Sequence, residues 1–200
     1  MNDILPGEVE TWQFLEQSAR DVFGLYGFSE IRTPIAEKTE LFCRSIGETT
    51  DIVEKEMYTF NDKSEKSLTL RPEGTAPVMR SFIQNRLHNL DPVSKLFYLG
   101  PMFRYERPQK GRYRQFHQIG AEVIGVEDAK IDAQVLAMLH QYFVRVGIES
   151  VSLQINSLGC PDCRPGYRQK LIGYLELCLD NLCADCCLLY TSDAADDMQC

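Results

Sequence analysis

Apolar residues recur at helical spacing in several stretches of this chain. Between residues 8 and 26 the apolar positions include Trp12, Ala19 and Phe23, and Gly27 marks the end of the predicted helix. Helices are also predicted over residues 75–87, 130–146 and 166–182.

Extended segments lie between these helices. Short strands are predicted over 28–32, 52–60, 67–71 and 151–155, the first of them stopped by Thr33-Pro34. Two longer strands, 95–106 and 113–124, are joined by the turn-rich residues 107–112, which predicts a long antiparallel hairpin. Antiparallel strands interleaved with helices indicate an α+β fold with a mainly antiparallel sheet.

Composition narrows the possible functions. The 200 residues are 44% hydrophobic and 25% charged, which suits one globular domain or part of a larger one. A net charge of −8 argues against binding nucleic acid through bulk charge, so any RNA contact requires a local basic patch. No apolar run reaches the ~18–20 residues of a membrane span, and the N-terminus lacks a signal-peptide pattern. We therefore expect a cytoplasmic protein with no membrane contact.

The second long strand has two chemically different faces. Phe116, Gln118, Gly120 and Glu122 alternate with the more apolar set His117, Ile119, Ala121 and Val123. The second set is expected to face the core, with His117 a buried packing residue. The first set, joined by Arg104 and Glu106 of the preceding strand, suits either a ligand-binding face or a solvated face with charges paired across strands.

The hairpin tip is basic. One acid, Glu106, stands among five cations in residues 104–114: Arg104, Arg107, Lys110, Arg112 and Arg114. Such a tip can keep an edge hairpin soluble or contact phosphate, and clustering in an acidic chain favours phosphate.

Three segments resemble the class II aminoacyl-tRNA synthetases, and the histidyl-tRNA synthetase family in particular. The run from Phe103 to Gln118 resembles motif 2 (about 100–123), and residues 27–34 resemble motif 1, whose proline, here Pro34, helps form that family's dimer interface. Residues 68–75, Leu-Thr-Leu-Arg-Pro-Glu-Gly-Thr, resemble its histidine-binding loop. The resemblance implies a partial class II catalytic domain over residues 1–186, the N-terminal part of such an enzyme, with an incomplete antiparallel sheet flanked by helices. Residues 187–200 break the pattern and are expected to be a non-native tail.

The resemblance also implies a function and a site. The activity is ATP-dependent activation of histidine and its ligation to tRNA(His), by a homodimer that takes ATP with Mg2+. Arg104 is expected to hold the α-phosphate and to act in catalysis. ATP would also contact Glu106, which accepts from the adenine amino group, Phe116, which stacks on adenine, and Arg112. Histidine would be bound by Glu73, Gly74, Thr75, Arg104, Gln118 and Glu122, the last of these at the imidazole. No P-loop pattern competes with this interpretation.

Two further expectations follow from the resemblance. Parts of the family's site, including the motif 3 arginine, lie beyond Cys186, so the 200-residue chain is expected to be inactive alone. The main alternative is the regulatory subunit of ATP phosphoribosyltransferase, a non-catalytic relative that binds histidine. The synthetase-like residues 107–112, with Glu73, Thr75, Gln118 and Glu122, favour the enzyme.

Cysteines are concentrated near the C-terminus. Cys160, Cys163, Cys183 and Cys186 have the spacing C-x2-C-x19-C-x2-C, which is typical of a structural zinc site. The predicted helix between the two pairs is ~25 Å long if straight, so a shared metal requires it to bend. Gly173 offers a break. A zinc site and four independent cysteines both remain open.

Overall fold

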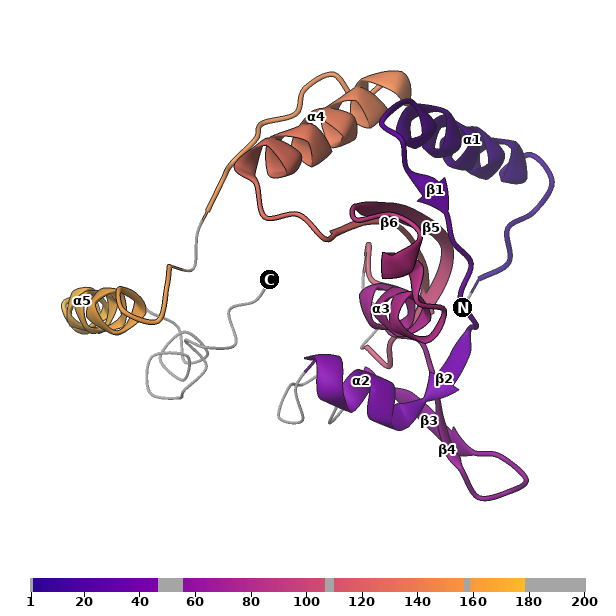
Figure 1. The fold of residues 1–200 in the computed structure, drawn as a ribbon, viewed down its shortest axis with the longest axis horizontal. Coiled ribbons are helices and arrows are strands. Elements are labelled where there is room, and N and C mark those ends of the chain that lie inside the picture. The colour runs from indigo at the N-terminus through magenta and orange to yellow at the C-terminus, as the bar shows by residue number, and fades with distance from the viewer. Residues whose placement is uncertain (1, 47–55, 107–109, 157–158, 179–200) are drawn as a thin grey trace. The chain divides into compact units, whose positions relative to one another are not determined.

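The computed structural model describes residues 2–46, 56–106, 110–156 and 159–178. The chain divides into two compact units, Met1–Val151 and Ser152–Cys200. The first unit contains both sheets (Figure 1), and the candidate site lies within it. In the second unit the described helix is α5 (Arg164–Glu176).

The larger sheet has the order β1-β5-β6. Strand β1 (Ser29–Glu30) runs parallel to β5 (Ser94–Phe103), which pairs antiparallel with β6 (Gln115–Ile124). In the β5–β6 register, Tyr98 lies opposite Gly120 and Gly100 lies opposite Gln118. The predicted hairpin is therefore confirmed, but its strands are shorter than expected, and Arg104 and Glu106 lie beyond the end of β5.

Helices cover both faces of this sheet. On one face, α1 (Val9–Leu25) and α4 (Ala129–Arg145) pack through Phe23, Met138 and neighbouring apolar residues against Phe97. On the other face, α3 (Thr75–Gln84) packs through Val78 against Tyr98 and Met102. Ile119, Ala121 and Val123 pack in the first cluster, whereas Phe116 packs in the second. The predicted division of β6 into two faces is confirmed.

The smaller sheet is antiparallel, with the order β2-β4-β3. It comprises β2 (Ala36–Lys38), β3 (Tyr58–Asn61) and β4 (Ser67–Leu70), and helix α2 (Thr39–Ile46) follows β2 directly. Residues 71–74 connect the end of β4 to the start of α3. This connection contains the first residues of the candidate site.

Most elements predicted from periodicity are present, and the α+β prediction is confirmed. Helix α3 ends at Gln84, and a short 3-10 helix, η2 (Leu87–Asn89), follows it. The predicted strand over 151–155 was wrong, because these residues are exposed and pair with no strand. Strand β2 and helix α2 were not predicted from the sequence. Across the residues described, no helix combines the length and apolar character required to cross a membrane.

Candidate functional site

The first turn of α3 is closed by a carboxylate from the loop before it. Glu73 accepts hydrogen bonds from the backbone N–H groups of Thr75 and Ala76, the latter at 3.0 Å. Gly74 is the N-cap residue and provides no side-chain cap, so Glu73 satisfies donors that a helix start leaves free. Glu73 therefore caps α3 from the residue before the N-cap. This contact also fixes the position of Thr75.

Thr75 joins helix α3 to strand β6. Its hydroxyl donates to Oε1 of Glu122 at 2.7 Å. Burial raises the pKa of Glu122, the Thr75 hydrogen bond lowers it, and the nearby Glu73 carboxylate raises it again. A half-buried carboxylate in this setting favours a ligand that brings an N–H donor or positive charge.

Tyr98 fills the space between α3 and the β5–β6 hairpin. It is 3% exposed, and a methyl group added at Gly120 would lie 2.7 Å from its Cε1 and closer to its Cζ and Oη. A methyl group at Gly74 would lie 2.7 Å from its hydroxyl oxygen and closer to its ring carbons. Burial, followed by the Glu122 carboxylate, raises the pKa of Tyr98 to about 12, so its hydroxyl stays protonated at neutral pH. The ring of Tyr98 thus occupies the space that Gly120, which has no side chain, leaves open on this face of β6.

Gln118 lies between Phe116 and Glu122 on the same face of β6. Its side-chain Oε1 is buried and has no hydrogen-bond partner among the described residues. An unpaired buried acceptor destabilises a protein by roughly 1–3 kcal/mol, so such atoms point to a strain site or a ligand contact.

The arginine at the end of β5 is held in place from two sides. Nε of Arg104 donates to the backbone oxygen of Pro72 at 3.0 Å, and its guanidinium carbon lies 5.3 Å from the centre of the Phe116 ring. Nη1 of Arg104 lies 3.9 Å from Oε1 of Glu106, whose other oxygen is 3.6 Å from Nε of Arg112. The four residues predicted to contact ATP therefore form one group. Arg104 and Glu106 are partly buried, whereas Arg112 is exposed.

Pro34, His117 and Arg107 are three further residues to which the sequence assigns a role. Pro34 is exposed, next to Ile35, which is 46% exposed. His117 lies on the α1 side of the sheet, 4.5 Å from Trp12 between ring centres, and burial lowers its pKa. It packs against Trp12, but it is partly buried and not fully buried as predicted. Arg107 lies outside the described residues.

The structure describes two of the four cysteines of the predicted zinc site. Cys160 and Cys163 are exposed, with sulfur atoms 3.5 Å apart at the start of α5. Cys183, Cys186 and the tail 187–200 lie outside the described residues. Within the ranges described, no three His, Cys, Asp or Glu side chains are grouped to hold a metal ion.

Two residues of this region were missed by sequence reasoning. Tyr98 lies in the predicted strand 95–106 and received no role, although its position opposite Gly120 follows from the hairpin register. Arg71 lies within the loop motif of residues 68–75, and its side chain is 4% exposed. An arginine directly after an apolar strand and before Pro-Glu-Gly was the available signal.

Comparison with known proteins adds independent findings. The family model for histidyl-tRNA synthetase matches residues 1–161. A histidine–tRNA ligase from Syntrophotalea carbinolica is 72% identical over 200 residues, which are 100% of this chain and 48% of that protein. The chain thus spans about half the length of the curated relatives it matches.

Solved structures with a similar fold also include histidyl-tRNA synthetases. The apo histidyl-tRNA synthetase of S. aureus has a TM-score of 0.71 and 38% identity, covering 100% of this chain and 47% of its own. A Bacillus halodurans protein, described as an ATP phosphoribosyltransferase regulatory subunit/histidyl-tRNA synthetase, has a TM-score of 0.64 and 26% identity, over 75% of this chain and 38% of its own. The predicted class II synthetase-like fold is confirmed, and the chain belongs to the histidyl-tRNA synthetase family.

Proposed function

We propose that the full-length protein containing this chain activates histidine with ATP and ligates it to tRNA(His). The observation that carries the proposal is the buried, unpaired Oε1 of Gln118, on the strand face that also bears Phe116 and Glu122. An acceptor in that position suits the α-ammonium group of an amino acid. Membership of the histidyl-tRNA synthetase family supports histidine as that amino acid.

Each side chain has a role consistent with its geometry. Glu122 accepts from an imidazole N–H, and it rejects apolar analogues because they bring no donor to its half-buried carboxylate. Glu73 and Thr75, beside Gly74 at the start of α3, complete the pocket for the α-amino group. Because its ring is locked against Gly74 and Gly120, Tyr98 limits the depth of this pocket.

The nucleotide lies over the other end of the hairpin in this proposal. Phe116 offers a ring for stacking adenine, and Glu106, already between Arg104 and Arg112, accepts from its amino group. Arg104 stabilises charge on the α-phosphate while the histidine carboxylate attacks phosphorus and pyrophosphate leaves. ATP enters with Mg2+ on its phosphate oxygens, since Mg2+ is usually bound largely by phosphates and water.

Partners follow from the same proposal. In the cytoplasm, the 3′-terminal hydroxyl of tRNA(His) attacks the carbonyl carbon of the adenylate, so that histidine is esterified to the tRNA and AMP leaves. The exposed Pro34 and Ile35 contribute to a homodimer interface. Residues 1–186 form part of the catalytic domain and residues 187–200 are a non-native tail. The remaining catalytic and tRNA-binding parts lie outside this chain, which is therefore inactive alone.

The test uses a completed ligase, in which residues 1–186 are followed by the C-terminal half of the S. carbinolica relative. Histidine-dependent ATP–pyrophosphate exchange is measured for wild type, Arg104→Ala and a control, Arg145→Ala. Arg145 is an exposed arginine at the end of α4, 3.8 Å from Asp21, and its loss is expected to leave exchange unchanged. Loss of Arg104 should lower the exchange rate by roughly 10²–10³-fold.

Two outcomes contradict the proposal. Near wild-type exchange in Arg104→Ala removes the assigned catalytic role. Histidine binding without exchange in the completed wild-type protein supports the regulatory-subunit alternative, which the B. halodurans relative keeps in view.

A further inference from the structure

Arg71 is the one arginine that is fully buried among the described residues, at 4% exposure. Burying a guanidinium is unfavourable unless its donors are satisfied, so the partners of a buried arginine reveal its role. Here the partners are not carboxylates in direct hydrogen-bond contact but backbone and hydroxyl oxygens from two distant segments.

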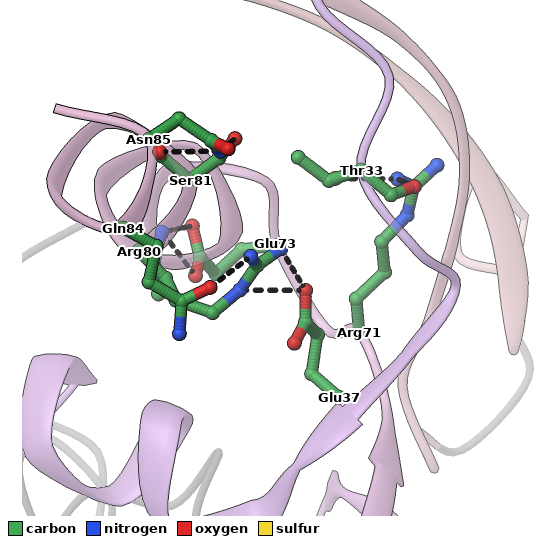
Figure 2. A network of polar contacts seen from close by, with 9 residues as sticks. Thr33, Glu37, Arg71, Glu73, Arg80, Ser81, Gln84 and Asn85 are labelled. Carbon is green, nitrogen blue, oxygen red and sulfur yellow. Dashed lines mark hydrogen bonds and ion pairs between the residues drawn. The ribbon is translucent and has the colours of Figure 1, made fainter. Parts of the chain in front are cut away.

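The guanidinium joins the motif 1 segment to strand β5. Nη1 of Arg71 donates to the backbone oxygen of Thr33 at 3.1 Å and to its hydroxyl at 3.0 Å, while Nε donates to the backbone oxygen of Pro101 at 3.0 Å. Figure 2 shows the side chain of Arg71 extending to Thr33. Its Nη2 packs against Gly100, where an added methyl group would lie 2.5 Å away. Gly100 is the register partner of Gln118.

The backbone of the same segment holds the end of β5 and the catalytic arginine proposed above. The N–H of Arg71 donates to Ile35, and its carbonyl accepts from Phe103 at 3.0 Å. The next carbonyl, of Pro72, accepts from Nε of Arg104 at 3.0 Å. A shift of residues 71–72 therefore moves the carbonyl that orients the Arg104 guanidinium.

We propose that Arg71 is a positioning residue, which holds residues 71–72 between Thr33 and Pro101 so that the Pro72 carbonyl orients Arg104 toward the α-phosphate. This inference rests on the proposed function. It also makes the motif 1 segment, which carries Pro34, part of the support for the reacting group. A purely structural Arg71 would stabilise the fold without acting through Arg104.

The test is a double-mutant cycle in the completed ligase, with Arg71→Met and Arg104→Ala made singly and together. Arg71→Met is expected to lower kcat of pyrophosphate exchange by roughly 10–100-fold, with a smaller change in KM for histidine, because misplacing a reacting group mainly affects the transition state. In the Arg104→Ala background the same change should lower kcat by less than about threefold, since the group that it positions is already gone.

Two further variants keep the test decisive. Arg80→Met removes a different, partly buried arginine, whose Nη2 is 2.5 Å from Oε1 of Glu37. Figure 2 shows Arg80 beside Glu37 and away from Thr33. It should lower Tm while keeping kcat within about threefold of wild type. If Arg71→Met does not fold, Arg71→Lys is used, which keeps the charge but cannot span both acceptors, and it should show the same dependence on Arg104.

The outcomes separate the two proposals. Absence of exchange in the completed wild type overturns the proposed function. If the completed wild type shows exchange, two results overturn the positioning role. In one, Arg71→Met lowers kcat equally with and without Arg104→Ala; in the other, Arg71→Met lowers only Tm. The positioning role is supported if Arg71→Met lowers kcat when Arg104 is present but not in the Arg104→Ala background.

Discussion

Gly120→Ala tests whether Tyr98 is locked between strand β6 and the start of α3. The added methyl group would lie 2.7 Å from Cε1 of Tyr98, and closer to Cζ and Oη. Retreat toward α3 is blocked, because the ring is already in contact with Gly74. The clash can be relieved only by moving the hairpin or by rotating Tyr98 out of a site where it is 3% exposed.

The expected loss of stability follows from these two routes. Overpacking with a small backbone shift costs about 1–3 kcal/mol. Expulsion of the ring approaches the ~3–5 kcal/mol of an aromatic-to-alanine change in a core. For a domain of 150–250 residues, each kcal/mol corresponds to a Tm change of about 2–4 °C.

The assay is thermal unfolding of the completed ligase, with Gly24→Ala as the matched control. Gly24 lies within α1, and nothing would lie within 4 Å of its added methyl group. The control should raise stability by about 0.4–1 kcal/mol, because alanine restricts the unfolded chain. In a Tyr98→Leu background, Gly120→Ala should be much less destabilising. A Gly120→Ala variant as stable as wild type would refute the arrangement of Tyr98.

Three further outcomes are expected. Burial raises the pKa of Glu122, so its stabilising contribution is full below the ordinary glutamate pKa and is lost as pH rises through the raised value. Glu122→Gln should therefore flatten the fall of Tm with pH in that window and abolish histidine-dependent exchange; an unchanged pH profile contradicts the assignment. Metal analysis of the completed ligase, purified without chelator, should find at most one zinc per chain, lost when Cys160 and Cys163 are changed to Ser; zinc that survives this change lies elsewhere. The 200-residue chain alone should exchange pyrophosphate at least about tenfold more slowly than the completed ligase, because further charge donors are absent; a comparable rate would show that the first half suffices.

The sequence predicted the elements whose signal is local. Apolar periodicity located α1 and α4, and strict alternation along β6 separated His117 and its neighbours from Phe116, Gln118 and Glu122. Both signals succeed because a helix and a strand have fixed repeats, so one packed face appears as a simple pattern. The short β2 and α2 were missed because of their length: β2 has three residues, and α2, although amphipathic, has eight, fewer than the roughly 11–18 residues over which helical periodicity is assessed. The predicted strand over 151–155 failed for the complementary reason: apolar alternation alone does not supply a neighbouring strand.

Only the tertiary structure decided how the site is supported. The sequence by itself determined the candidate residues, through motif resemblance and strand alternation. It did not show that Tyr98 fills the space beside Gly120 or that the unpaired acceptor is Oε1 of Gln118. It also gave no sign that Arg71 bonds to Thr33 and Pro101, which are 38 and 30 residues away in the chain. Alternation and periodicity are properties of neighbouring residues, whereas these contacts exist only after the two sheets and α3 have packed together.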